Sequence, residues 1–328
     1  MAILDQLSDF RVYSIEMRTR FRGVTTREGL LFRGPAGWAE WSPFAEYAYP
    51  EIGLWWDAAL EMATEGFPPP LRQRIPVNVT VPAVDPGQAH QIVASSGCRT
   101  AKVKVAESGQ NFSQDIERVE AVRDALGAGG KVRVDANGAW NVQEALTRLR
   151  RLNGFELEYA EQPCASVGEL AELRLQLARR GANILVAADE SIRRADDPQR
   201  VVDAEAADIA VVKVQPLGGV RKALALAQRL GLPVVVSSAL ETSVGLRAGL
   251  ALAAALPELP YACGLNTSRL LVKDVVSTPL SAVDGELRLA DVEVAEPEAW
   301  EAPSATRAKW ERRLQGVLAN IEAARKGG

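Results

Sequence analysis

Short β-rich runs alternate with helical patterns along most of the chain, and this alternation limits the possible folds more than any other feature. Eight such runs occur, at residues 75–83, 100–105, 131–137, 155–163, 184–191, 208–214, 232–241 and 261–265. The segments between them carry apolar residues at three- and four-residue spacing, with glycine near several ends. Eight strands that alternate with helices predict an α/β fold, a parallel βα barrel of the TIM type. An open doubly wound sheet usually has a GxGxxG motif or a P-loop at a strand end, and the chain has neither.

The two ends of the chain show other patterns. Residues 10–34 predict paired strands with glycine-containing turns, and residues 51–67 predict a helix that ends before three consecutive prolines. After residue 284, one more strand and a helix over 305–327 are predicted. We therefore expect an α+β capping domain that begins with residues 1–84, a catalytic barrel over 85–283, and a C-terminal segment, 284–328, that returns to the cap.

The composition excludes several classes of function. With 328 residues, 47% of them hydrophobic, the chain can bury a large core, and its net charge of -4 without basic blocks argues against nucleic acid or a membrane surface as partner. The first residues do not resemble a signal peptide and no long uncharged apolar stretch occurs, so we expect a cytosolic protein. The three cysteines form no CxxC pair and His90 is the single histidine, which leaves Lys, Asp, Glu, Tyr and Cys for chemistry.

Five successive runs end on an ionisable residue. These residues are Lys104, Asp135, Glu161, Asp189 and Lys213, spaced 24 to 31 residues apart, which is close to one βα unit each. Because enzyme barrels place their chemistry at the carboxyl ends of the strands, we expect all five side chains around one mouth. For any single acid, pairing with a lysine or capping the next helix is an equally good explanation, and Asp189 suits a cap. That explanation is much weaker for five positions in a row.

Three of these five residues are acids that would face one another. Carboxylates so placed repel, and one or more must stay protonated unless a cation lies between them. Oxygen ligands that leave positions open for water and substrate favour Mg²⁺ over zinc, and Mn²⁺ is also compatible. The sequence therefore predicts a magnesium site formed by Asp135, Glu161 and Asp189.

The run TAKVKV puts Lys102 and Lys104 on one side of a strand and Ala101 and Val103 on the other. Lysines that face a barrel interior cost desolvation energy unless they reach a polar mouth. A lysine near Mg²⁺ and other cations is shifted towards the neutral amine, which makes it a base near neutral pH. Lys104 and Lys213 are expected to approach a substrate from opposite sides. Lys102, deeper in the barrel, is expected to neutralise a substrate carboxylate or to lower the pKa of Lys104.

The motifs KVK, VDANGAW, EQP, ADES and VVKVQPLGG, between about residues 100 and 220, resemble the enolase superfamily in its muconate-lactonizing-enzyme-like subgroup. This resemblance implies a capping domain on a modified βα barrel, Mg²⁺ held by the three acids, and removal of a proton alpha to a carboxylate to give a metal-stabilised enediolate. Within the subgroup, the short chain, Arg133 in VRVDAN, TTREGLL in the cap and the run SSALETS most resemble the o-succinylbenzoate synthase family of menaquinone biosynthesis.

That family resemblance implies a dehydration, catalysed by a lyase. Lys104 removes the alpha proton of 2-succinyl-6-hydroxy-2,4-cyclohexadiene-1-carboxylate, and hydroxide leaves with help from the same ammonium. Lys213 stays protonated and stabilises the intermediate. The expected substrate-contact or supporting residues are Lys102, Arg133, Asn137, Ser237, Ser238, Gly218 and Thr25. For Arg133 and Asn137 a place as polar residues of the barrel interior stays open, and for Gly218 a plain turn.

Other outcomes use the same residues. Deprotonation by Lys104 and reprotonation by Lys213 would racemise an N-acyl (N-succinyl) amino acid or epimerise a dipeptide. Dipeptide epimerases carry an Asp-x-Asp pair after the eighth strand, and CGLNTSRLL has no acid before Asp274, which disfavours that branch. Mandelate-racemase-like chemistry needs a His–Asp dyad that His90 cannot supply. A non-catalytic binding barrel is disfavoured because all five positions are filled. The expected partner is a small-molecule carboxylate, and the oligomeric state stays open.

Overall fold

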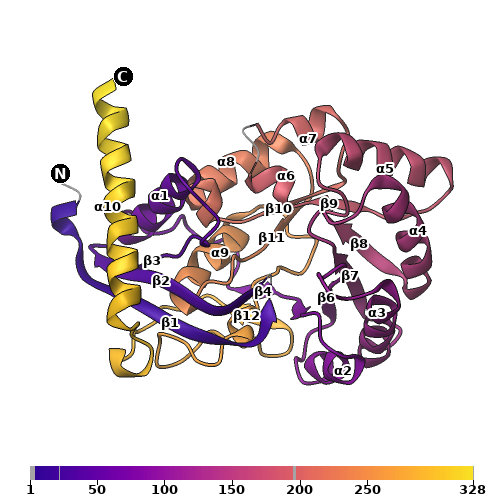
Figure 1. Ribbon diagram of the computed structural model, residues 1–328, viewed down its shortest axis with the longest axis horizontal. Helices are drawn as coiled ribbons and strands as arrows, with labels where there is room; N and C mark the ends of the chain where they lie inside the picture. Colours follow the sequence, from indigo (N-terminus) through magenta and orange to yellow (C-terminus); the bar gives the residue numbers. More distant parts are fainter. Residues whose placement is uncertain (1–3, 22, 195–196, 328) are drawn as a thin grey trace.

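The computed structural model describes residues 4–21, 23–194 and 197–327, and its central feature is one curved parallel sheet with helices on its outer side (Figure 1). The sheet has seven strands that lie side by side in chain order, so the predicted α/β barrel architecture is confirmed. The strands are β5 (Val79–Val81), β6 (Thr100–Lys104), β7 (Lys131–Asp135), β8 (Leu157–Glu161), β9 (Val186–Ala188), β10 (Ile209–Val212) and β11 (Val234–Val236).

The predicted eighth strand, residues 261–265, closes the barrel through isolated bridges. Asn78 donates its backbone N–H to the carbonyl of Cys263 at 2.9 Å, and Ser238 donates to the carbonyl of Gly264 at 3.0 Å. This segment thus joins the first and last strands of the sheet without forming a regular ladder. The predicted run 75–83 is divided, because Pro76 lacks an N–H: β4 (Arg74–Pro76) pairs antiparallel with β12 (Glu286–Arg288), and only β5 enters the barrel.

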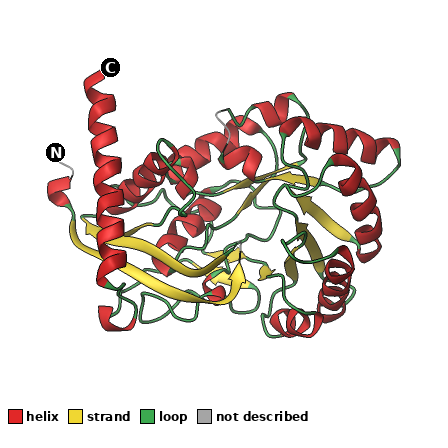
Figure 2. Cartoon of the chain, viewed as in Figure 1, coloured by secondary structure: helices red, strands yellow, loops and turns green. Residues whose placement is uncertain are grey.

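The helices cover the outer face of the sheet, as the red elements of Figure 2 show. Those of the barrel are α2 (Pro86–Ala94), α3 (Phe112–Leu126), α4 (Val142–Leu152), α5 (Val167–Arg179), α6 (Glu190–Arg193), α7 (Arg200–Asp203), α8 (Val220–Leu230) and α9 (Ser243–Ala255). Asn111, Asn141 and Ser166 each form a capping box with the Gln or Glu three residues later, which fixes where α3, α4 and α5 begin. Short 3-10 helices lie at η1 (Leu4–Gln6), η2 (Asn153–Phe155), η3 (Gln215–Leu217), η4 (Ser268–Leu270) and η5 (Pro297–Ala299).

Alternation along each strand separates two buried regions. Ala101 and Val103 of β6 belong to the large core between the sheet and its helices. A second, smaller apolar cluster fills the barrel interior and contains Tyr159, Ala187, Ile209, Val211 and Val235. Lys102 and Lys104 have the opposite parity to Ala101 and Val103, so they face this interior.

An antiparallel sheet precedes the barrel in the chain and lies beside it. It consists of β1 (Ser8–Phe21), β2 (Val24–Gly34) and β3 (Gly37–Trp41), and α1 (Glu51–Thr64) and the terminal helix α10 (Ser304–Gly327) pack against it (Figure 1). Trp41 makes edge-on ring contacts with Trp56 of α1 and Trp310 of α10, at centroid distances of 5.8 and 5.5 Å. The cap therefore joins both ends of the chain. The exact domain limits at residues 84 and 284 stay a prediction.

None of the helices in the described part of the chain is both long and apolar enough to cross a lipid bilayer.

Two acids are buried where the capping sheet meets the barrel. Glu40 of β3 is 0% exposed and Glu241, in the segment between β11 and α9, is 4% exposed. Burial raises the pKa of Glu241 to about 7, and the charge of Glu40 adds to this effect, while Arg27 opposes it. Burial also raises the pKa of Glu40, although hydrogen bonds from Thr242 and Ser42 and the charge of Arg27 act against it.

We predict that Glu241 makes the protein less stable as the pH rises through about 7. The folded state holds this proton more tightly than the unfolded chain, so its contribution to stability is fully present below the unfolded pKa and is lost above the folded one. At about 1.4 kcal/mol per pKa unit, the loss approaches about 3 kcal/mol. Urea unfolding of Glu241→Gln between pH 5 and 8 should show a smaller decline than the wild-type protein.

The control for this measurement is Glu258→Gln, which removes an acid that is exposed at the surface. It should follow the pH dependence of the wild-type protein. An unchanged slope in Glu241→Gln would contradict the prediction.

Candidate active site

Four of the five predicted ionisable residues line one small cavity at the carboxyl ends of the strands. They are Lys104, Asp135, Asp189 and Lys213, all at most 5% exposed. Water can enter about 30 Å³ of this space, whereas ligand sites commonly measure about 300–1,000 Å³. Side chains that close the cavity, such as Phe21 from the end of β1, must therefore move when an organic ligand binds.

A larger cleft of about 760 Å³ lies next to this cavity and shares Thr80 with it. It is lined mainly by residues of β1, β5, α2 and the segment from residue 266 onward, and it contains none of the five ionisable strand-end residues. We place the chemistry in the smaller cavity because the paired charges converge there.

Lysines from β6 bind carboxylates from the next two strands. Lys104 Nζ lies 2.5 Å from Asp135 Oδ2, and Lys102 Nζ lies 2.7 Å from Glu161 Oε1 and 3.5 Å from Asp135 Oδ2. Burial acts to raise the pKa of Asp135, but the two ammonium groups outweigh it and hold this pKa well below its usual range. Burial likewise acts to lower the pKa of Lys102, and the charges of Glu161 and Asp135 outweigh it and raise that pKa. Lys102 lies two residues before Lys104 along β6, but its Nζ reaches Glu161 at the end of β8, and Lys102 lines the same cavity as Lys104.

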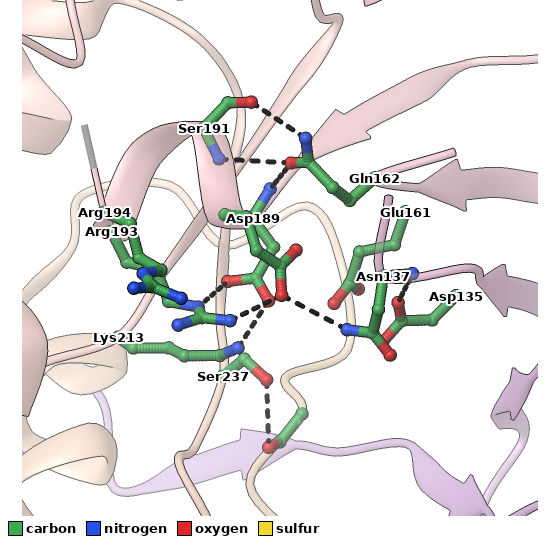
Figure 3. Close-up of polar contacts among 12 residues, drawn as sticks. Asp135, Asn137, Glu161, Gln162, Asp189, Ser191, Arg193, Arg194, Lys213 and Ser237 are labelled. Atoms are coloured by element: carbon green, nitrogen blue, oxygen red, sulfur yellow. Dashed lines mark hydrogen bonds and ion pairs between the residues drawn. The ribbon is translucent and has the colours of Figure 1, made fainter. Parts of the chain in front are cut away.

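Asp189 has two cationic partners (Figure 3). Lys213 Nζ lies 2.6 Å from Oδ2, and Arg193 Nε lies 3.0 Å from Oδ1. Burial acts to raise the pKa of Asp189, and the positive charges of Arg193 and Lys213 more than reverse this and lower it. Asp189 occupies the N-cap position of α6, yet its side chain makes no capping hydrogen bond. The alternative explanation of Asp189 as a helix cap is therefore wrong.

Glu161 is the least satisfied of the three acids. It is 1% exposed, and its Oε2 has no hydrogen-bond partner among the residues that the structure describes. Burial raises the pKa of Glu161 to about 7, and Lys102, which contacts only Oε1, lowers it incompletely. Lys102 Nζ therefore compensates one carboxylate oxygen, while Oε2 is buried without a partner among the described residues. An additional cation next to Oε2 would offset the free-energy cost of burying this oxygen without a partner.

Within the described ranges, no three His, Cys, Asp or Glu side chains already stand at metal-binding spacing. The ammonium groups of the lysines lie among the carboxylates instead. The donor set still suits a hard divalent cation, because Asp135, Glu161 and Asp189 are buried oxygen donors on adjacent strands and Glu161 keeps one oxygen unbound.

Four other predicted residues border the cavity, namely Lys102, described above, and Asn137, Ser237 and Ser238. Asn137 follows β7 with a φ of 48°, accepts a hydrogen bond from Lys104 Nζ through Oδ1, and donates its backbone N–H to Asp135 Oδ1 at 3.0 Å. Ser237 and Ser238 come from the end of β11, and the Ser238 hydroxyl lies 2.6 Å from that of Thr267.

Arg133 lies below the cavity in the barrel interior. It is 0% exposed, with Nε 2.6 Å from Glu158 Oε2 and its guanidinium 4.6 Å from the centre of the Tyr159 ring. Of the two roles left open for it, the position in the barrel interior is the one observed.

Two predicted residues lie outside the cavity. Gly218, with a φ of 85°, ends η3, and its nearest neighbours are Lys222 and Leu54, so it belongs to the junction with α1 and α8. It acts there as a turn, because this φ favours glycine. Thr25 is exposed on the strand β2 and does not line the cavity.

The structure adds residues that the sequence analysis did not single out. Gln162 is fully buried, accepts the backbone N–H of Asp189 at 2.9 Å through Oε1, and donates to Ser191 Oγ at 2.8 Å (Figure 3). It thereby fixes the start of α6, and its position directly after Glu161 in EQP was the available signal. Phe21, Thr80, Leu240 and Thr267 also line the cavity, and they carry no ionisable group that spacing alone reveals.

Comparison with protein families gives the class. A model described as enolase C-terminal domain-like matches residues 86–293, and one described as enolase N-terminal domain-like matches residues 12–63. Among solved structures, a muconate lactonizing enzyme from Pseudomonas fluorescens superposes with a TM-score of 0.76 at 19% identity, covering 90% of this chain and 98% of the other. A dipeptide epimerase from Enterococcus faecalis superposes at 0.72 and 21% identity, covering 88% and 97%. The chain therefore belongs to the enolase superfamily.

Full-length relatives give the narrower family. The o-succinylbenzoate synthase of Thermobifida fusca is 61% identical over 313 residues, which is 92% of this chain and 97% of that protein. The o-succinylbenzoate synthase of Mycobacterium tuberculosis (strain H37Rv) is 50% identical over 318 residues, covering 96% and 94%. The chain belongs to the o-succinylbenzoate synthase family.

Proposed function

We propose that this protein forms o-succinylbenzoate by dehydrating 2-succinyl-6-hydroxy-2,4-cyclohexadiene-1-carboxylate, with Lys104 as the base. Full-length identity of 61% to an o-succinylbenzoate synthase supports the reaction. One structural observation supports the mechanism. Lys104 on β6 and Lys213 at the end of β10 border the same cavity, and the three strands β7, β8 and β9 lie between β6 and β10. A ring bound in the cavity would have an amine on each side.

Asp135, Glu161 and Asp189 would hold Mg²⁺, with Mn²⁺ as a chemically similar substitute. When bound, the ion would neutralise the negative charge that builds on the substrate carboxylate as the alpha proton leaves. The unpartnered Oε2 of Glu161 and the burial of all three acids support this assignment. Lys102 remains beside Glu161 and Asp135 and balances part of their charge.

Lys104 is proposed to act twice. As the free amine it takes the proton from the carbon next to the carboxylate, and the C–H electron pair is held first on the carboxylate and forms the new ring double bond only as the ring hydroxyl leaves. The C–O bond to the ring hydroxyl then breaks, and the Lys104 ammonium returns a proton to the leaving hydroxide to give water. Asn137 Oδ1, which accepts from Lys104 Nζ, orients the amine for both steps.

Lys213 is proposed to stay an ammonium, paired with Asp189 at 2.6 Å. From the other side of the ring it would stabilise developing negative charge, including through the ring face. The hydroxyl groups of Ser237 and Ser238 are proposed to bind a substrate carboxylate, and Arg133 to support the barrel floor through Glu158.

The same two lysines allow a second activity. If Lys213 delivers a proton to the face opposite Lys104, an N-succinyl amino acid would be racemised. The shared cavity is the observation that favours this side reaction.

We further propose a cytosolic enzyme, in line with the absence of nucleic-acid or membrane signals in the sequence.

The first test measures turnover of the cyclohexadiene carboxylate, monitored by the change in ultraviolet absorbance when the ring becomes aromatic. We expect turnover with Mg²⁺ and its loss on adding excess chelator, with recovery when Mg²⁺ is restored. A protein that stays inactive with Mg²⁺ would refute the proposed reaction. Deuterium exchange at the alpha carbon of N-succinyl amino acids would then test the racemase reaction.

A further inference from the structure

The β11–α9 loop, residues 237–242, forms one wall of the catalytic cavity. Ser237, Ser238, Ala239 and Leu240 all line this space. Leu240 has a φ of 61°, in the left-handed region that residues with a branched side chain rarely adopt. Such a conformation persists only where surrounding contacts enforce it.

Arg27 of the capping sheet holds the loop by its backbone. Its Nε donates to the carbonyl of Leu240 at 3.0 Å, and its Nη2 donates to the carbonyl of Ala239 at 3.2 Å. The same guanidinium binds the hydroxyl of Ser42 at 2.9 Å and lies 4.5 Å from the centre of the Phe44 ring. Arg27 is 2% exposed. It connects two loop carbonyls directly to the cap, and only a guanidinium has the planar set of donors for this.

Glu40 holds the other end of the loop. Its Oε2 accepts from the backbone N–H groups of Thr242 at 3.1 Å and Gly245 at 3.0 Å, and from the Thr242 hydroxyl at 2.5 Å. These donors lie at the beginning of α9, where N–H groups have no partner within the helix. The Tyr13 hydroxyl donates a hydrogen bond to Glu40 Oε1 at 2.8 Å and so holds the Glu40 side chain in place. Glu40, a residue of the capping domain, thus accepts hydrogen bonds from N–H groups at the start of α9, as the side chain of a helix N-cap residue does.

We infer that Arg27 and Glu40 are positioning residues, which hold the β11–α9 loop in the shape that presents Ser237 and Ser238 to the substrate. The capping sheet would then set substrate affinity without touching the reacting atoms. The kinetic part of this inference rests on the proposed function. The structural part, that the cap holds the loop, does not.

The test compares Arg27→Lys with Arg72→Lys. Arg72 is a matched control, since it donates to the carbonyls of Ala253 and Pro257 near the opposite end of α9, away from the cavity. In Arg27→Lys we expect KM to rise about tenfold or more, with a smaller fall in kcat and unchanged Mg²⁺ affinity. Amide hydrogen exchange over residues 239–242 should also become faster. Arg72→Lys should leave KM and the rate of amide hydrogen exchange over residues 239–242 as in the wild-type protein.

A second variant, Glu40→Gln, keeps the size of the side chain and removes its charge, so it serves if Arg27→Lys does not fold. It should raise KM in the same direction and increase exchange at Thr242 and Gly245. The inference is overturned if exchange over 239–242 and KM stay as in the Arg72→Lys control. An inactive wild-type protein would refute the proposed function alone, because hydrogen exchange still tests the loop.

Discussion

Lys104→Ala should lower kcat for the dehydration at least about 1,000-fold, because the variant lacks both the base and the proton donor for the leaving hydroxide. The remaining groups, including Lys213 on the other side of the cavity, are paired with acids and do not replace it. Substrate should still bind, since the two serines that follow β11 and the three acids are unchanged. In the ultraviolet assay, turnover by Lys104→Ala should be very slow or absent. In calorimetry, its Kd for the product should be close to that of the wild-type protein.

A suitable control is Lys222→Ala, which removes an exposed lysine paired with Asp57 at 2.8 Å. It should retain wild-type kcat. Because Lys104 also neutralises Asp135, folding of Lys104→Ala must be checked by its unfolding transition in the presence of Mg²⁺. A folded variant that keeps a tenth or more of wild-type kcat would show that another group is the base.

Glu161→Gln should remove most of the effect of Mg²⁺ on the protein. A ligand that binds only the folded state stabilises it by about 2.7 kcal/mol at 100 times its Kd, so Mg²⁺ should raise the unfolding temperature of the wild-type protein. In Glu161→Gln the neutral amide is a weaker ligand than the carboxylate. We expect the Mg²⁺ Kd to rise at least about 100-fold and turnover to fall below detection at Mg²⁺ concentrations that saturate the wild-type protein.

Thermal unfolding with and without Mg²⁺ checks this prediction independently of activity. Glu169→Gln is the control, because Glu169 lies in the capping box of α5 and glutamine suits that position equally well. It should show the full Mg²⁺-dependent rise. An equal rise in Glu161→Gln would mean that Glu161 is not a metal ligand.

The alternation of β-rich and helical segments predicted the barrel, and the five ionisable strand ends predicted the cavity, for a local reason. Strand periodicity places every second side chain on one face, and parallel strands end at the same edge of the sheet. Those two rules are enough to bring Lys104, Asp135, Asp189 and Lys213 together from sequence spacing alone. The same rules put Arg133 deeper in the interior, where the structure has it, whereas Lys102 lines the cavity together with Lys104.

What spacing did not reveal depends on contacts between distant parts of the chain. Arg27 and Glu40 reach loop residues more than 200 positions away, and residues 261–265 close the barrel by bridges to both of its edges. Gly218 and Thr25 looked like site residues, yet the packing of α1 and the course of β2 leave them outside the cavity. The sequence determined the strand order and the residues at the strand ends, because both follow from local periodicity. The tertiary structure alone decided which loops complete the cavity, because that depends on how the cap packs on the barrel.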